Sequence, residues 1–182
     1  MKVVEGEKTK LKRRLENMSK SELVALMQEL VRLGKDNRAY VEAKLAGPSE
    51  IKEVIEYYKK IVEDEFFPKR GIGKIRLRTA KKAISDFKKA NGDIGGVIDL
   101  MIYYVENGTR FTNEYGDIDE RFYSSMESMF GNVTDSLNRI GDKELTKRFR
   151  PRLKKIVDDA KGIGWGYYDS LSYMLDELEG EG

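Results

Sequence analysis

Apolar residues recur every three or four positions along most of this chain, which is the period of an amphipathic α-helix. The pattern is clearest in residues 94–114, where apolar side chains share one helical face and polar side chains the opposite one. No segment shows the strict alternation that is typical of a half-buried β-strand. Comparable stripes predict further helices at residues 19–33, 35–45, 51–67, 77–90, 119–140, 142–160 and 165–178.

Short, often glycine-rich connections separate these stripes, so consecutive helices should pack as antiparallel hairpins. The sequence therefore predicts an all-α fold of seven to eight helices, arranged as an α-solenoid-like stack or an irregular bundle. No motif of the tetratricopeptide or ankyrin kind occurs, so the pattern does not indicate a true repeat array.

Local signals predict where several helices begin. Ser19 followed by Glu22 matches a capping box, and Ser49 is expected to cap the helix that follows it. The glycines of residues 162–166 favour a tight turn, in which Trp165 is expected to fill part of the core. No strand precedes this turn and no Gly-Lys-Ser/Thr follows it, so it does not match a phosphate-binding loop of the P-loop type.

The length of 182 residues and the 40% hydrophobic content allow the chain to bury a core. Because the first eighteen residues are polar, we expect a flexible tail at 1–18 and a single helical domain at 19–182. The charged N-terminus lacks the apolar segment of a signal peptide, and no apolar run approaches the roughly 18 residues that span a membrane. These features predict a cytoplasmic protein that does not associate with membranes.

The chain contains neither Cys nor His. Disulfides, thiolate chemistry and every site that depends on imidazole are therefore excluded. Chemistry would have to use carboxylates, Lys, Arg, Tyr, Ser or Thr. No pairing of a nucleophile with a base can be recognised, so the sequence assigns no catalytic residue, no metal ligand and no cofactor.

Charge is sorted into blocks although the whole chain has a formal net charge of only +2. Residues 69–89 hold nine Lys or Arg and one Asp, for a net charge of +8. Residues 90–131 hold eight Asp or Glu and two Arg, for a net charge of −6. Such segregation makes either two complementary internal faces or a basic binding surface beside an acidic one.

The basic segment has two interpretations. Its side chains either surround a narrow apolar stripe and pair with the neighbouring acidic helices, or they remain free to contact phosphates or another polyanion. Under the second interpretation the candidate binding residues are Lys69, Arg70, Arg76, Arg78, Lys81 and Lys82.

The acidic segment also has two interpretations. Carboxylates on facing helices can hold Mg²⁺ through oxygen ligands without any His. Alternatively, the acids cap helices and line a solvated face. The candidate residues, which include two tyrosines on the same faces, are Asp99, Tyr103, Glu106, Asp117, Asp119, Tyr123 and Glu127.

Several short strings occur together in this chain: FFPKRG at 66–71, AKKAISDFKK at 80–89, YYVE at 103–106, FTNEYGDID at 111–119 and GIGWG at 162–166. Their combination resembles a family of small, uncharacterised bacterial and archaeal proteins that is described only as a domain of unknown function. The likeness covers residues 19–178. It implies a bacterial or archaeal cytoplasmic protein, and it implies no particular active-site residue.

Three functions remain open from the sequence. The leading hypothesis is a non-catalytic helical binding or scaffold protein that takes a protein or peptide partner in a charged groove between residues 77–89 and 94–140. The second is nucleic-acid binding through residues 69–89. The third is a Mg²⁺-dependent, phosphate-handling enzyme that uses Glu106, Asp117, Asp119 or Glu127.

Overall fold

The chain is all-helical in the part that the computed structural model describes, residues 10–180. Residues 10–16 are helical, and eight further helices follow, with no strand among the described residues. The predicted all-α fold is confirmed, with one helical segment more than the largest number expected. That segment lies inside the predicted polar tail, of which residues 1–9 fall outside the described residues.

The helices keep close to the predicted stripes and divide between two compact units, Met1–Leu45 and Ala46–Gly182. The sequence did not indicate a boundary at residue 45, and the expectation of a single domain from residue 19 onward stays a prediction. The helices are α2 (Lys20–Leu33), α3 (Lys35–Leu45), α4 (Ile51–Phe66), α5 (Leu77–Ala90), α6 (Ile94–Tyr115), α7 (Glu120–Ile140), α8 (Lys143–Asp159) and α9 (Tyr167–Gly180).

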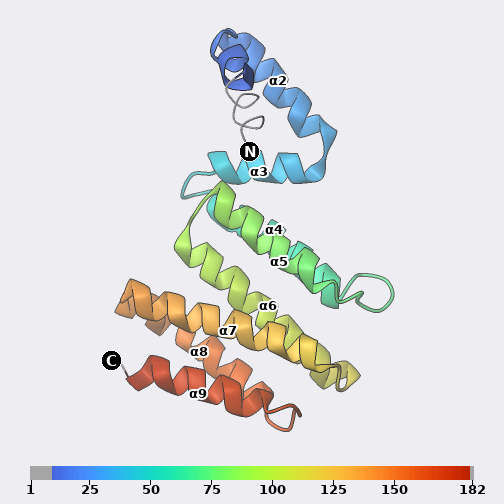
Figure 1. Ribbon diagram of the computed structural model, residues 1–182, viewed down its shortest axis with the longest axis vertical. Coiled ribbons are helices and arrows are strands. Elements are labelled where there is room, and N and C mark those ends of the chain that lie inside the picture. The colour runs from blue at the N-terminus through green and yellow to red at the C-terminus, as the bar shows by residue number, and fades with distance from the viewer. Residues whose placement is uncertain (1–9, 181–182) are drawn as a thin grey trace. The chain divides into compact units, whose positions relative to one another are not determined.

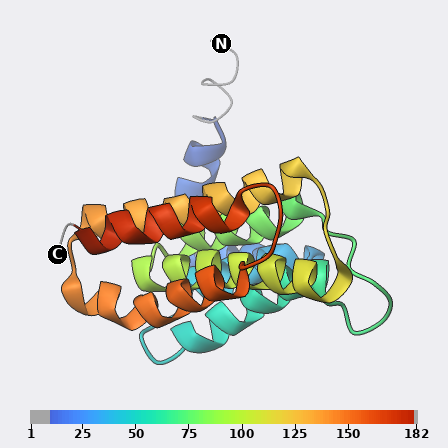
Figure 2. The same cartoon turned by 90° about the horizontal axis from the view of Figure 1, so that it is seen from below.

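The second unit is a stack of helical hairpins, as the sequence predicts. Helix α4 packs on α5, α6 on α7 and α8 on α9, so each hairpin is made of consecutive helices (Figure 1). Helix α6 also contacts α4, α5 and α8, which makes it the central helix of this unit. Figure 2 shows α9 lying along α7; this contact and the one between α6 and α8 join the last hairpin to the middle one.

Close packing around α6 depends on small residues. A Cβ atom at Gly108 would lie 2.2 Å from the Sδ atom of Met126 on α7, and Met126 itself is fully buried. The methionine sulfur therefore occupies the space that a side chain at position 108 would need. Glycine at this position allows α6 and α7 to approach as closely as they do.

Helix caps confirm some of the local predictions and correct one. The capping box of Ser19 and Glu22 forms at the start of α2. The predicted cap at Ser49 is wrong, because α4 begins after Glu50 and has no side-chain cap. The Glu50 carboxylate instead accepts a hydrogen bond from the backbone N–H of Gly47 at 3.0 Å, which fixes the turn ahead of the helix.

The first unit buries far fewer hydrophobic side chains than the second. Its helices α2 and α3 pack on one another. No residue of α2 is buried, and Ala39 and Ala43 are the only buried hydrophobic residues among the described residues of this unit. No helix among the described residues is long and apolar enough to span a membrane.

Candidate binding surface

Helix α5 presents a basic face along its whole length. Ala80, Ile84 and Phe87 are buried on one side. On the opposite side, helical spacing aligns the exposed cations of this helix within one sector. We call this set the basic face; it consists of Arg78, Lys81, Lys82, Lys88 and Lys89.

The loop ahead of α5 continues the basic face and is held by a buried acid. Glu65 of α4 is only 4% exposed. Its carboxylate accepts two hydrogen bonds from the Arg76 guanidinium, at 2.9 and 2.7 Å, and one from the Arg76 backbone N–H at 3.2 Å. The Glu65 carbonyl also accepts from the backbone N–H of Ile75 at 2.9 Å. This clamp closes the loop that carries Lys69, Arg70 and Lys74.

The same loop passes very close to the end of α4. A Cβ atom at Gly73 would lie 2.1 Å from the backbone carbonyl oxygen of Phe66. Glycine is therefore required at this approach. Phe66 is fully buried, so the loop passes over the core end of α4, which ends one residue before the predicted boundary at residue 67.

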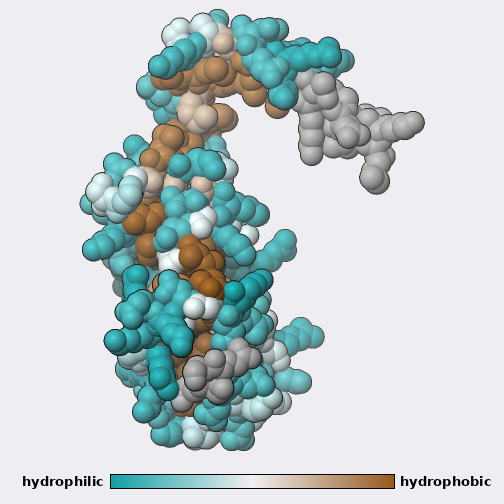
Figure 3. Space-filling model, turned by 90° about the vertical axis from the view of Figure 1, so that its left-hand side faces the viewer, coloured by the Kyte–Doolittle hydropathy of each residue, from teal (hydrophilic) through white to brown (hydrophobic). Residues whose placement is uncertain are grey.

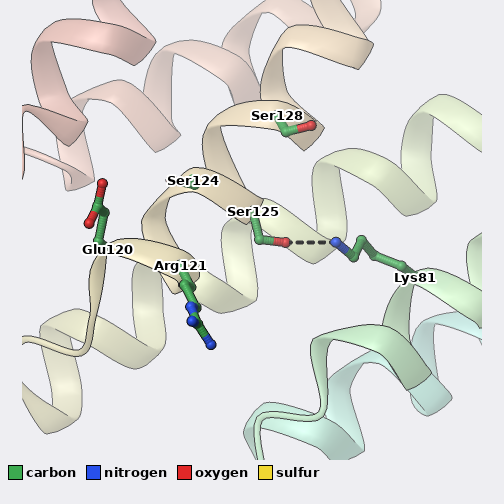
Figure 4. A pocket seen from close by; sticks show the side chains of 6 residues that line it. All are labelled: Lys81, Glu120, Arg121, Ser124, Ser125 and Ser128. Carbon is green, nitrogen blue, oxygen red and sulfur yellow. Dashed lines mark hydrogen bonds between the residues drawn. The ribbon is translucent and has the colours of Figure 1, made fainter.

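A shallow depression of about 550 Å³ lies between α5 and α7. Lys81 extends from α5 to Ser125 on α7, with 3.1 Å between Nζ and Oγ (Figure 4). The Ser125 hydroxyl lies 2.9 Å from the Tyr104 hydroxyl, and burial raises the pKa of Tyr104 to about 12. The depression is lined by Lys81, Glu120, Arg121, Ser124, Ser125 and Ser128.

Two acids of α6 meet a cation that comes from far along the sequence. Glu106 accepts two hydrogen bonds from Arg152 of α8, both at 2.7 Å, and Asp99 accepts a third. The second oxygen of Asp99 lies 3.1 Å from the Nζ of Lys59 on α4. Burial by itself lowers the pKa of Arg152, but the hydrogen bonds to Glu106 and Asp99 outweigh it and raise that pKa. This ionic cluster joins α4, α6 and α8.

Asp117 lies in a network of aromatic side chains. It accepts hydrogen bonds from the Tyr123 hydroxyl at 2.5 Å and from the Trp165 indole N–H at 2.9 Å. These two bonds lower the pKa of Asp117, while burial and Asp117 raise the pKa of Tyr123.

The prediction that Trp165 fills part of the core is wrong: the side chain is 56% exposed, and the residue has φ at 63°. Its ring lies at the surface because Asp117 holds the indole nitrogen there.

The remaining candidate residues of the acidic segment have separate roles. Asp119 caps α7 by accepting from the backbone N–H of Phe122 at 2.8 Å. Burial raises the pKa of Glu127, and a hydrogen bond with Ser170 opposes that rise. Tyr103 is half-buried, with Lys59 5.5 Å from its ring centre.

The basic and acidic segments therefore do not neutralise one another. Within the described part of the chain, none of the eight acids of residues 90–131 forms an ion pair with a cation of residues 69–89. Of the nine cations, Arg76 pairs with Glu65, Lys82 with Asp86, and Lys81 bonds Ser125. Six have no ion pair or hydrogen bond to any described residue: Lys69, Arg70, Lys74, Arg78, Lys88 and Lys89.

The carboxylates proposed for Mg²⁺ do not converge. Glu106 binds Arg152, Asp117 binds two aromatic side chains, and Asp119 caps a helix. No group of three or more acidic side chains in the described residues is placed to share a metal ion. The geometry gives the magnesium hypothesis no support.

Sequence reasoning missed the residues that hold this surface in place. Glu65 follows Tyr58 and Val62 at helical spacing, so it lies on the apolar stripe of α4. Arg152 likewise lies between Phe149 and Ile156 on the stripe of α8. A charged residue on an apolar stripe needs a buried partner. The position of Glu65 and Arg152 on such stripes was therefore the signal from which their role could have been predicted. Ser125 and Arg121 carried no comparable signal.

The comparisons with known proteins agree with the resemblance seen in the sequence. A model of a family of unknown function, DUF6155, matches residues 7–179. The chain therefore belongs to this family. No curated protein and no solved structure matches it.

Proposed function

We propose that this protein is a non-catalytic helical binding protein, and that it takes an acidic segment of a partner protein along the basic face of α5. The proposal rests on one observation above all. Within the described residues no acid of residues 90–131 pairs with a cation of residues 69–89, and six of those cations have no ion pair or hydrogen bond to any described residue. Charges of one sign that are held together without partners raise the local concentration of opposite charge and favour its binding.

The depression beside the basic face favours a peptide over a nucleic-acid backbone. Serine hydroxyls, Lys81 and Arg121 can bind carboxylates and backbone carbonyls. Glu120 lines the same depression. An anion there would repel a continuous row of phosphates, whereas a peptide can place a backbone N–H or a basic side chain opposite it.

Nucleic-acid binding is the second candidate, and the length of the basic face favours it. Five exposed cations follow one side of a 14-residue helix, a span of about 20 Å at the rise of an α-helix. A row of this length can follow a phosphate backbone. Such binding would weaken steeply with salt, because each neutralised phosphate releases counterions.

The family resemblance supports the rest of the proposal. We expect the protein to work in the cytoplasm of a bacterium or archaeon. We propose no catalytic residue and no bound cofactor.

A charge-reversal experiment tests the proposal. Binding of a fluorescent polyglutamate peptide and of a short RNA or DNA duplex is measured by anisotropy at low and at moderate salt. The test variant carries Arg78→Glu, Lys88→Glu and Lys89→Glu. The control carries Lys143→Glu, Lys147→Glu and Lys154→Glu, three exposed residues of α8, and so changes the net charge equally. We expect the test variant to lose peptide binding on the order of tenfold or more, and the control to keep it.

Three outcomes separate the candidates. Peptide binding that only the α5 variant loses supports the acidic partner. Duplex binding without peptide binding, again lost only in the α5 variant, favours the nucleic acid. Absence of both at low salt, or equal loss in the two variants, contradicts a binding site on this face.

A further inference from the structure

The hydrogen bonds around Ser125 determine what its own proton can do. Tyr104 is fully buried, so its hydroxyl proton needs an acceptor. Among the described residues the one hydrogen-bond partner of that hydroxyl is the Ser125 Oγ, 2.9 Å away. Tyr104 therefore donates to Ser125. If Ser125 donated instead, the Tyr104 proton would be left in the core without an acceptor.

Lys81 makes a second bond to the same oxygen. Its ammonium group has donors only, so the Ser125 Oγ, 3.1 Å from the Lys81 Nζ, accepts again. The hydroxyl then accepts two bonds and still has its single proton to donate.

The proton of Ser125 has no acceptor within the described part of the chain. A helical Ser or Thr often donates to a backbone carbonyl one turn earlier. Thr134 and Ser136 of α7 do so, to the carbonyls of Gly131 and Asn132. Ser125 makes no such bond, and it lines the depression between α5 and α7. Its proton is therefore available to a ligand in that depression.

A second cation lies beside this hydroxyl. Arg121 precedes Ser125 by one helical turn on α7 and lines the same depression. The side chain is exposed and has no ion pair or hydrogen bond to any residue that the structure describes. Glu120 is next to it in the chain, but in Figure 4 the Glu120 carboxylate points away from Lys81 and Ser125. The depression therefore keeps two cations that its own acid does not neutralise.

The chemistry of these groups fits one carboxylate. A carboxylate is an acceptor only and takes several hydrogen bonds, which matches the Ser125 proton and the free N–H groups of Lys81 and Arg121. Glu120 adds a negative charge to the lining, which disfavours a doubly charged phosphate. Every lining residue is polar or charged, so the depression offers no place to an apolar side chain. Hydrophobic surface gathers over the first unit, at the top of Figure 3, and is no part of this depression.

We propose that this depression anchors the acidic partner: one carboxylate of the acidic segment accepts the proton of Ser125 and pairs with Lys81 and Arg121. The carboxylate comes from the segment that lies along α5, so this anchor rests on the proposed function. Lys81 belongs to both the basic face and the depression, and it connects them. Tyr104 is a positioning residue, because its bond from the core leaves the Ser125 proton to the ligand.

Two variants isolate the Ser125 hydroxyl. Tyr104→Phe removes the inner bond but leaves the Ser125 proton, so it should keep most of the peptide binding. Tyr104→Phe with Ser125→Ala removes both partners of the inner bond, which disturbs the fold little, and also removes the proton offered to the ligand. Binding of the fluorescent polyglutamate peptide is measured by anisotropy at low salt. We expect the double variant to bind on the order of tenfold more weakly than Tyr104→Phe, the effect of losing a hydrogen bond to a charged group.

Matched controls lie on the same helix. Ser136→Ala removes a hydroxyl that donates to a backbone carbonyl, and it should leave peptide binding unchanged. Arg121→Gln, at an exposed position that does not endanger the fold, should weaken binding severalfold. Arg139→Gln changes the net charge equally at another exposed position of α7 and should not weaken it. The circular dichroism and the urea midpoint of the double variant should stay close to those of Tyr104→Phe.

The outcomes separate this anchor from the proposed function. Equal peptide binding by Tyr104→Phe and the double variant, with binding still lost on charge reversal of α5, overturns the anchor alone. Equal effects of Arg121→Gln and Arg139→Gln, or a loss in Ser136→Ala as large as in the double variant, also overturn the anchor. Absence of peptide binding by the wild type at low salt overturns both.

Discussion

Two charged regions of the second unit show how differently the same kind of residue can be used. Around Arg152, charges of both signs from α4, α6 and α8 meet, and the side chains of Lys59, Asp99, Glu106 and Arg152 are between 12% and 31% exposed. On α5, exposed cations follow one side of the helix, and Arg78, Lys88 and Lys89 have no ion pair or hydrogen bond to any described residue. The first region joins three helices of the fold, and the second is the one that we propose for binding. A block of charge in the sequence does not decide between these roles, because the role depends on the partner of each charge. The partner of Glu106 and Asp99 is Arg152, which lies 46 and 53 positions away from them in the sequence.

The largest effect is expected from breaking the ionic cluster. Arg152→Met would leave Glu106 without a cation and Asp99 with Lys59 alone. Removing one partner of a largely buried ion pair is costly because the remaining charge stays poorly solvated, and we expect a loss of about 3 kcal/mol in the free energy of unfolding. Urea unfolding followed by circular dichroism measures this loss.

The matched control lies on the same helix. Lys154 is exposed, and Lys154→Met should change the free energy of unfolding by no more than about 0.5 kcal/mol. Charge reversal on α5, as in Lys88→Glu with Lys89→Glu, should have an equally small effect. Equal destabilisation by Arg152→Met and by the α5 variant would refute the division between a stabilising and a binding region.

A smaller effect is expected at Glu65, which holds the loop ahead of α5 through Arg76. Glu65→Gln removes the charge that binds the Arg76 guanidinium, so the loop of residues 67–76 should open more often. That loop offers trypsin four cleavage sites. We expect cleavage there to become faster on the order of tenfold, the effect of losing a charge-assisted hydrogen bond. Asp64→Asn, which removes the neighbouring acid and its pair with Lys60, should leave the cleavage rate unchanged. Unchanged cleavage in Glu65→Gln would show that Glu65 does not hold the loop.

The smallest effect concerns an acid that has no cation. Hydrogen bonds from Tyr123 and Trp165 favour the ionised form of Asp117 and lower its pKa. The stabilisation they provide is therefore complete above the ordinary aspartate range and is lost as the pH falls through the lowered pKa. Trp165 is the only tryptophan, so its fluorescence reports this change directly. We expect a transition with a midpoint below the ordinary aspartate pKa, and none in Asp117→Asn. A transition that persists in Asp117→Asn would assign it to another group.

The helices could be predicted because their signals are local. Periodic apolar stripes, the capping box of Ser19 and Glu22, and Asp119 ahead of α7 depend on residues within a few positions of one another. The cap at Ser49 was mispredicted for a local reason too: Glu50 takes up the N–H of Gly47, and the helix starts one residue later than a Ser49 cap requires.

The candidate site was predicted only in part because its partners are distant in sequence. The basic residues were found from composition alone. Whether the basic residues would be neutralised depended on two pairs of residues that are distant in sequence. Arg152 binds Glu106, and Glu65 binds Arg76. Periodicity places Arg152 and Glu65 on apolar stripes, but no local pattern connects either of them to its partner. Trp165 was misplaced because apolar character suggests burial, while a hydrogen bond from its indole nitrogen to Asp117 keeps the ring at the surface.

Because of the contact between Gly108 and Met126, oxidation of Met126 can report how often the core opens. With no cysteine in the chain, methionine is its only sulfur-containing residue. Met126 is fully enclosed, and its sulfur fills the gap above Gly108. An added sulfoxide oxygen has no space there, so peroxide can reach this sulfur only when α6 and α7 separate. The rate at which Met126 is oxidised, followed by peptide mass spectrometry, therefore measures how often the central hairpin opens.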